Sequence, residues 1–315
     1  MSYTEHYSVL KDECLDHLLE KEGAAKGLFA DLTFGGGGHT KAILESAPEA
    51  HVIACDQDPE ALANGKKLIE QNHWEERLTL LDMNFENFPE AAQEILKQRG
   101  KDGFHGIVMD LGVSSHHFDS SERGFSFRHE GPLDMRMNPR SDSPTAADIL
   151  NEASLEELER ILKEYGEEKL ATRIAQAIVE QRKKDPFEST KDLENLVFHC
   201  YPKKWRYGKT HPSTRTFQAL RIAVNRELEV LTEVISQLPE LLLPGGRLLV
   251  ISFHSLEDRI VKHAFKRLAG PKKEGPYQIL TKKPIVPSEE EQKENARSRS
   301  AKLRVLERVV ENLKK

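Results

Sequence analysis

The chain has 315 residues, of which 31% are charged and 38% hydrophobic, and its net charge is −6. No apolar run approaches the length of a membrane span, and residues 1–6 show no basic segment leading into an apolar one. Cys14, Cys55 and Cys200 stand far apart without metal-ligand spacing, which indicates reduced thiols. These features exclude a membrane-spanning or disulfide-rich secreted protein, and we predict a cytoplasmic globular protein.

Short apolar runs alternate with helical stretches between residues 27 and 112. We predict buried strands at 28–32, 52–55, 78–81 and 107–109, and helices near 40–46 and 59–71. This alternation favours an α/β fold with a mostly parallel, doubly wound sheet. Ligands of such sheets bind beyond the carboxyl ends of the strands. The acids expected at those ends are Asp31, Asp56, Asp82 and Asp110.

The rest of the chain changes in character twice. Residues 112–147 show no clear period, but their apolar side chains indicate an ordered, packed loop. Helical periods follow to residue 236, the last with Phe217, Leu220, Val224, Leu228 and Leu231 on one stripe. A strand is predicted at 247–252, a mobile surface loop at 271–294 and a last edge strand at 302–306. We therefore predict a catalytic domain of residues 1–135 and 237–315, with an all-helical insertion of residues 136–236.

A glycine run, residues 35–38, follows the first strand and opens a helix. Dinucleotide-binding enzymes place G-x-G-x-x-G there, but Lys41 stands where the third glycine is required. The turn suits S-adenosylmethionine better, because that cofactor has no phosphate and needs only close backbone packing. Asp56 fits the carboxylate that accepts from ribose hydroxyls, and Phe85 could cover the adenine. A tight turn, a helix cap and a core aromatic are the alternatives.

Asp110 ends the fourth strand, where the reacting methyl group is expected. Its carboxylate can accept a hydrogen bond from an exocyclic base amine and so expose the nitrogen lone pair, while alignment supplies much of the acceleration. The alternative is that Asp110 only contacts the cofactor or caps the next turn. His39, His116, His117 and His254 show no ligand spacing, so we predict no metal.

Residues 199–226 carry seven Lys or Arg and no acid. Cations neutralise phosphates, and exposed aromatic rings stack on unpaired bases. We predict RNA contacts by Lys203, Lys204, Trp205, Arg206 and Arg215, with the target base unpaired or extruded. The alternative is a solvated loop whose aromatic side chains are buried.

Several longer motifs resemble the bacterial small-subunit ribosomal RNA cytosine-N4 methyltransferases. They are TFGGGGH (33–39), DLGVSS (110–115), ERGFSF (122–127), GPLDMRM (131–137), HPSTRTFQA (211–219) and ISFHSLEDR (251–259). The resemblance spans nearly the whole chain. It implies a class I (Rossmann-like) methyltransferase fold with a helical insertion, and N4-methylation of a decoding-region cytidine of 16S rRNA in the small ribosomal subunit.

By the same resemblance, the residues lining the S-adenosylmethionine pocket are Gly37, Gly38, His39, Asp56, Phe85, Asp110 and His117. The chain departs from the DNA amino-methyltransferases, since Leu-Gly follows Asp110 in place of Pro-Pro and an aromatic residue.

Two other classes of protein stay open on the sequence. A nicotinamide-dependent oxidoreductase would use the glycine turn and Asp56 but leaves the basic stretch without a role. A non-catalytic RNA-binding factor would use the basic stretch but not the cofactor pocket. We expect an assembled ribonucleoprotein as the substrate, and a homodimer is left open.

Overall fold

The computed structural model describes residues 8–21, 23–208, 210–271 and 275–310, except the side chains of Ser115 and His116. By its internal contacts the chain divides into two compact units. We call Met1–Gly112 with Leu228–Lys315 the sheet unit, and Val113–Glu227 the helical unit. The units change at 112/113 and 227/228, whereas the predicted division was at 135/136 and 236/237. No helix in the described ranges has the length and apolar character needed to cross a membrane.

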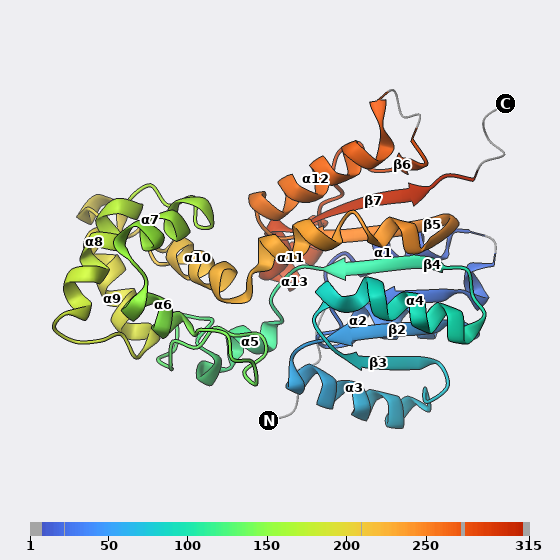
Figure 1. Ribbon diagram of the computed structural model, residues 1–315, viewed down its shortest axis with the longest axis horizontal. Coiled ribbons are helices and arrows are strands. Elements are labelled where there is room, and N and C mark those ends of the chain that lie inside the picture. Colours follow the sequence, from blue (N-terminus) through green and yellow to red (C-terminus); the bar gives the residue numbers. More distant parts are fainter. Residues whose placement is uncertain (1–7, 22, 209, 272–274, 311–315) are drawn as a thin grey trace. The chain divides into compact units, whose positions relative to one another are not determined.

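The sheet unit is built on one seven-stranded sheet in the order β3-β2-β1-β4-β5-β7-β6 (Figure 1). The strands are β1 (Leu28–Asp31), β2 (His51–Asp56), β3 (Leu78–Asp82), β4 (Phe104–Asp110), β5 (Leu242–Ser252), β6 (Tyr277–Ile279) and β7 (Lys302–Arg308). The pairs from β3 to β5 are all parallel, and β7 runs antiparallel to both of its neighbours. The chain leaves β1 toward β2 and later returns to β4 on the other side, so the strand order reverses at the β1–β4 pair. Ligands of open α/β sheets bind at such a reversal.

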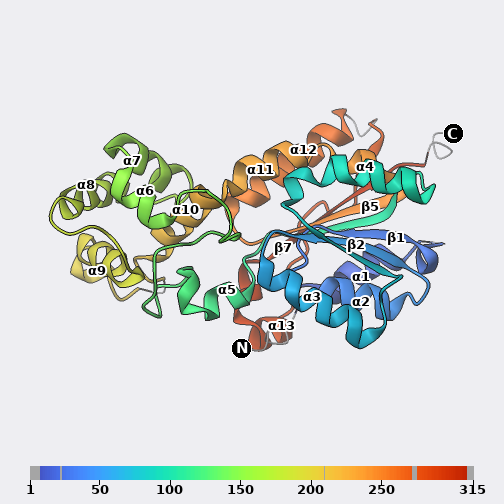
Figure 2. The same cartoon turned by 60° about the horizontal axis from the view of Figure 1, so that its bottom comes forward.

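Helices cover both faces of this sheet (Figure 2). One face packs against α4 (Phe88–Arg99), α11 (Glu227–Val234) and α12 (Ser255–Ala269), and the other against α1 (Lys11–Leu19), α2 (Gly38–Ser46) and α3 (Pro59–Asn72). Shorter elements of this unit are η1 (Ala24–Lys26), η2 (Phe85–Asn87), η5 (Leu238–Leu241), α13 (Glu289–Glu294) and η7 (Ala296–Ser300). The central strands are buried on both faces, which explains their continuous apolar runs. This arrangement confirms the predicted class I methyltransferase fold, with strand boundaries within a few residues.

The strand register staggers the acids at the carboxyl edge. Asp31 pairs with Ala54 on β2 and with Val108 on β4. Asp56 and Asp110 therefore extend two residues beyond Asp31, and they point to the same face because side chains alternate along a strand. That face is the one covered by α2. Asp31 is accordingly buried, while Asp56 and Asp110 are partly exposed.

The helical unit contains α5 (Ser115–Asp119), η3 (Ser121–Arg123), α6 (Ala146–Glu152), α7 (Leu155–Glu164), α8 (Ala171–Arg182), α9 (Thr190–Cys200), η4 (Lys203–Trp205) and α10 (Thr214–Asn225). Its core is formed by the predicted helical stripes, including Leu158, Ile174, Leu193 and Leu220. The described part of this unit has no strand longer than an isolated bridge, as predicted.

The prediction of an ordered, packed loop at 112–147 is confirmed, although it also contains α5 and the start of α6. Phe125, Leu133 and Met135 are buried in it. The Arg123 guanidinium is buried as well and donates to the carbonyls of Arg136 and Met137, 3.1 and 2.9 Å away. The loop therefore owes its order to apolar packing and to one buried cation that satisfies backbone acceptors.

Three predictions about elements are wrong. The predicted helix through Phe217 and Leu231 is two helices, α10 and α11, because Arg226 takes a left-handed conformation with φ +51°. The segment 271–294 is not wholly a mobile loop, since it contains β6 and α13, although residues 272–274 lie outside the described ranges. The strand β7 is not at an edge, because β6 pairs with its outer side.

α13 is held by a buried carboxylate. Glu291 accepts a hydrogen bond from the Leu10 backbone N–H at 2.8 Å, and its own N–H is capped by Ser288. Burial raises the pKa of Glu291, so its ionised form is disfavoured in the folded protein. The segment ahead of β7 is thus tied to the start of α1.

Replacing Glu291 separates its acceptor role from its charge. We expect Glu291→Ala to lower the free energy of unfolding by about 1–3 kcal/mol, because a buried N–H loses its acceptor. Glu291→Gln keeps an acceptor oxygen and removes the raised pKa, so its stability should no longer fall as the pH rises through the titration of Glu291. Urea unfolding between acidic and neutral pH measures both effects. Equal stability of the alanine and glutamine variants would contradict this role.

Candidate active site

The site begins with a buried acid at the end of β1. Asp31 is 1% exposed and accepts hydrogen bonds from the Thr40 hydroxyl at 2.7 Å and from the Thr33 N–H at 3.2 Å. Burial raises the pKa of Asp31, although His39 and these two donors oppose the shift. Asp31 therefore joins the end of β1 to the first turn of α2.

Asp56 lies at the end of the neighbouring strand β2. One carboxylate oxygen accepts from the Gly35 N–H at 2.7 Å and the other from the Asp58 N–H at 2.9 Å. Burial raises the pKa of Asp56 to about 6, against the effect of those two N–H donors. Each oxygen still has a lone pair for a further donor, such as a ligand hydroxyl. Asp56 thus holds the glycine turn while keeping capacity to bind a ligand.

Asp110 lies across the reversal of strand order, at the end of β4. Its N–H donates to the Thr33 hydroxyl at 2.7 Å, and one carboxylate oxygen accepts from the Gly112 N–H at 3.4 Å. The other oxygen lies 3.6 Å from Nε2 of His39, and the Asp110 side chain is 22% exposed. Asp110 is therefore held by contacts within the sheet unit, and its carboxylate remains partly exposed.

His39 is the second buried ionisable group of the site. Its Nε2 has no hydrogen-bond partner among the described residues, since the Asp110 oxygen is beyond hydrogen-bond distance. Burial disfavours its protonation, but the carboxylates of Asp110 and Asp31 outweigh burial and raise the pKa of His39. A buried polar atom without a hydrogen-bond partner, next to a partly exposed carboxylate, is typical of a site completed by a ligand.

The glycine turn that links β1 to α2 is tight. Gly37 has φ +77°, and a Cβ there would lie 2.7 Å from the Phe34 ring and 2.9 Å from Leu68. The Gly37 N–H donates to the Phe34 carbonyl, and Asn64 donates to the Gly36 carbonyl at 3.3 Å. The turn thus has left-handed geometry that favours glycine, and it offers backbone rather than side chains to a ligand.

Two further residues were predicted to contact the cofactor. Phe85 follows β3 in η2 and is half-buried against the apolar core, while Asn84 beside it donates to Gln57 at 3.2 Å. His117 belongs to the helical unit, where its ring stacks on Phe125 at 4.8 Å. The sheet unit therefore brings together Gly37, Gly38, His39, Asp56 and Asp110, and the roles of Phe85 and His117 stay predictions.

The predicted RNA-binding residues are partly exposed. Lys203 and Lys204 are exposed, and Trp205 is 51% exposed with the Lys204 ammonium 5.2 Å from its ring centre. Arg206 donates to the carbonyls of Tyr201 and His199, and Arg215 donates to that of Glu167. The alternative of buried aromatic side chains is thus wrong for Trp205. Lys209 of the same stretch lies outside the described residues.

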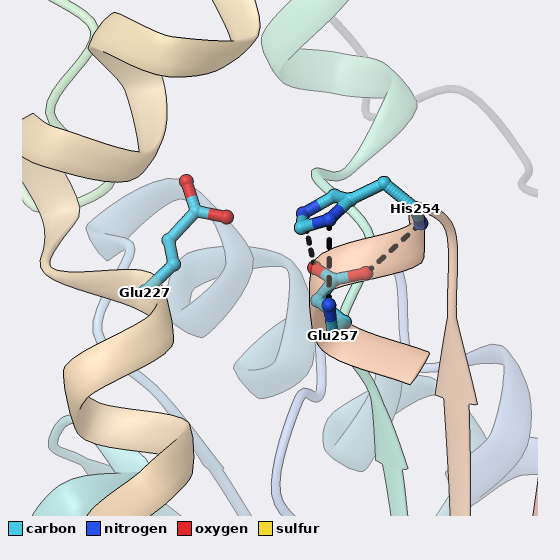
Figure 3. A group of neighbouring side chains, drawn as sticks. All are labelled: Glu227, His254 and Glu257. Atoms are coloured by element: carbon cyan, nitrogen blue, oxygen red, sulfur yellow. Dashed lines mark hydrogen bonds and ion pairs between the residues drawn. The ribbon is translucent and has the colours of Figure 1, made fainter. Parts of the chain in front are cut away.

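Of the four histidines, His254 serves as the N-cap of α12 (Figure 3). Its Nε2 lies 3.0 Å from a carboxylate oxygen of Glu257, whose other oxygen accepts from the backbone N–H groups of Phe253 and His254. Glu227, in the same figure, accepts two hydrogen bonds at 2.8 Å from Arg221 of its own unit. The description does not extend to the His116 side chain. Each of these groups has a structural role, and a metal-free reaction stays a prediction.

Thr33 and Thr40 were not among the predicted site residues. They flank the glycine run. Thr33 connects Asp31 with Asp110, since its N–H donates to Asp31 and its hydroxyl accepts from the Asp110 N–H, and the Thr40 hydroxyl connects Asp31 with α2. Their position beside the glycines was a signal, but which carboxylate each would meet depends on the sheet register.

A family model described as the MraW methylase family matches residues 3–309. The chain belongs to the MraW methylase family. Proteins named ribosomal RNA small subunit methyltransferase H are its relatives. That of Synechococcus elongatus is 46% identical, covering 97% of this chain and 95% of the relative. The relatives from Clostridioides difficile and Heliobacterium mobile are 43% and 47% identical to this chain. In both cases the match covers 96% of this chain and 99% of the relative.

Membership of the MraW methylases confirms the resemblance read from the motifs. Ligands of open α/β sheets bind at the reversal of strand order, which is where the glycine turn and the strand-end acids lie in this chain. Membership of this family does not favour the two alternatives, a nicotinamide-dependent oxidoreductase and a non-catalytic RNA-binding factor.

The buried acid Asp31 yields a test of the site's framework. Thr40→Val preserves shape but removes a buried donor, so we expect the free energy of unfolding at neutral pH to fall by about 1–3 kcal/mol. Because the variant raises the pKa of Asp31 further, its deficit should shrink at acidic pH, where Asp31 is protonated. Thr40→Ser keeps the hydroxyl and is the matched control. Urea unfolding across pH measures this, and a pH-independent deficit would contradict the pairing.

Proposed function

We propose that this chain transfers a methyl group from S-adenosylmethionine to the N4 amine of a decoding-region cytidine of 16S rRNA, in the small ribosomal subunit and in the cytoplasm. One observation carries the reaction. The Asp110 carboxylate is 22% exposed and lies 3.6 Å from Nε2 of His39, and the Thr33 hydroxyl holds the Asp110 backbone N–H. This carboxylate ends β4 at the reversal of strand order, next to the strand that leads into the glycine turn. The relatives named small-subunit rRNA methyltransferases support the choice of substrate.

The sheet unit fits S-adenosylmethionine. When bound, this cofactor supplies a methyl group activated by the adjoining sulfonium charge. The backbone of Gly37, Gly38 and His39 would accommodate its amino-acid portion, because glycine has no side chain to keep a ligand from the backbone. Asp56 would accept from ribose hydroxyls through its remaining lone pairs. Phe85 would cover the adenine, and His117 is added to this set by the resemblance alone.

Asp110 would act on the base amine. The lone pair of an exocyclic amine is delocalised into the ring, which makes the nitrogen a poor nucleophile. A carboxylate that accepts the amine hydrogen favours a pyramidal nitrogen, and it can take the proton that the methylated amine must lose. Holding the acceptor in place removes an entropic cost at the moment of reaction. Thr33 would hold the Asp110 backbone, and His39 would lie beside the carboxylate.

The helical unit would bind the RNA. Lys203, Lys204 and Trp205 expose two cations and an aromatic surface, which suit phosphates and unpaired bases. Arg206 and Arg215 would contribute their remaining N–H groups, since backbone carbonyls occupy only some of them. These contacts would select RNA with splayed bases over a regular duplex.

Removing Asp110 tests the reaction. We expect Asp110→Ala to lower kcat for methyl transfer to small subunits by about 10²- to 10³-fold, with cofactor affinity changed by less than about fivefold. Asp102→Ala is the matched control, because Asp102 is exposed just before the opposite end of the same strand. Labelled methyl transfer and calorimetric titration with the cofactor measure the two quantities. An unchanged kcat, or a loss confined to cofactor binding, would reject the proposed role.

The pKa of Asp56 predicts how cofactor binding depends on pH. If its ionised form accepts from ribose hydroxyls, affinity for S-adenosylmethionine should be highest above about pH 6 and fall by about tenfold per unit below it. Asp56→Asn should bind more weakly at neutral pH and lose this dependence. Equilibrium dialysis across this range provides the measurement. A flat profile for the unaltered protein would show that Asp56 only holds the turn.

A further inference from the structure

The helical unit contains a pocket of about 850 Å³ that neither the glycine turn nor the strand-end acids help to form. Its lining includes Arg128, Lys191, Glu194, Arg206, Tyr207 and His211, all from the helical unit. We call it the aromatic–cationic pocket. Its volume lies within the range of sites that hold small ligands of nucleotide size.

One wall of the pocket is a stack of rings. The His211 ring stacks with the rings of Phe127 and Phe198, whose centres lie 4.6 and 6.0 Å from its own at interplanar angles of 19° and 21°. His211 is therefore already engaged with two rings of the helical unit. Tyr207 meets the edge of this stack at 5.9 Å from Phe198, and it is 86% exposed. Tyr207 therefore offers the free aromatic face of the pocket.

The charge of the lining favours an anion. Three cations, Arg128, Lys191 and Arg206, face one carboxylate, Glu194. The Lys191 ammonium lies 2.6 Å from Glu194, and Arg206 is held by two backbone carbonyls. Arg128 is exposed, and its guanidinium forms no hydrogen bond or ion pair with the residues that the structure describes. A positive charge is thus available to a ligand.

Glu194 is fixed from two sides, which sets the position of Lys191. The Ser213 N–H donates to Nδ1 of His211 at 3.2 Å, so the proton of the neutral ring is on Nε2. That Nε2 faces Glu194 at 3.5 Å, while Lys191 binds the other carboxylate oxygen. The ammonium is therefore held at the pocket wall instead of moving freely in solvent.

We propose that the aromatic–cationic pocket binds one unpaired nucleotide of the substrate RNA, with the base stacked on Tyr207 and the phosphate bound by Arg128 and Lys191. An exposed aromatic ring beside a cation without an acidic partner among the described residues, Arg128, and an ammonium fixed at the pocket wall, Lys191, is a combination that suits single-stranded nucleic acid. The base must be unpaired, because a base inside a duplex does not expose its face to a side chain. The choice of RNA rests on the proposed function.

The test uses the full-length protein and a short fluorescein-labelled single-stranded oligoribonucleotide, with binding followed by anisotropy. Tyr207→Ala should weaken binding roughly 5- to 150-fold, the range for loss of one stacked base. Tyr207→Phe keeps the ring and should bind like the unaltered protein. Arg128→Gln should weaken binding and reduce the slope of log affinity against log salt by about 0.7, as one phosphate contact is lost.

Lys184→Gln is the matched control for charge, because Lys184 is an exposed cation of the same unit outside the pocket lining. Unchanged binding by both Tyr207→Ala and Arg128→Gln would overturn the proposal, and so would an equal loss in Lys184→Gln. Methyl transfer to small subunits separates the two hypotheses. Weakened oligonucleotide binding without any methyl transfer by the unaltered protein would retain the pocket and reject the reaction. Normal methyl transfer by the unaltered protein, with oligonucleotide binding unaffected in the pocket variants, would retain the reaction and reject the pocket.

Discussion

The buried carboxylate of Asp31 is the constraint on which the site depends. A carboxyl group that is 1% exposed is costly to ionise unless donors surround it, and here Thr40 and the Thr33 N–H supply them. These bonds fix the first turn of α2 against β1, and with it the direction of the glycine turn. The Thr33 hydroxyl also accepts a hydrogen bond from the Asp110 N–H, so the same constraint extends to β4. The glycine turn and Asp110 are therefore positioned by one connected set of hydrogen bonds.

The register of the sheet divides the roles of three similar acids. Asp31, the last residue of β1, pairs with Val108 of β4. Asp56 and Asp110 end their own strands two residues further along and point to the same face of the sheet. The shorter strand buries its acid as an anchor, and the two longer strands leave theirs partly exposed. His39 lies beside this array, and the nearby carboxylates raise its pKa despite its burial. In the proposed reaction this division separates support, cofactor binding and action on the amine, although all three residues are aspartates.

Much of the fold and part of the site could be predicted from the sequence, for physical reasons that differ between elements. Strands β1 to β4 were predictable because sheets buried on both faces need continuous apolar runs, and Asp56 and Asp110 followed from their ends. The break between α10 and α11 could not be predicted, because the left-handed conformation of Arg226 does not interrupt the pattern of apolar residues in the sequence. Nor could the inner position of β7, which depends on a pairing with β6. The roles of Thr33 and Thr40 could not be predicted, because the register of the sheet determines which groups their side chains bind.

The central claim is that this geometry serves methylation of a cytosine amine in ribosomal RNA. The most direct measurement supplies labelled S-adenosylmethionine and small subunits that lack the modification, then digests the RNA and identifies the labelled nucleoside. We expect the label to be recovered as N4-methylcytidine. Label in any other nucleoside, or in ribosomal protein, would contradict it.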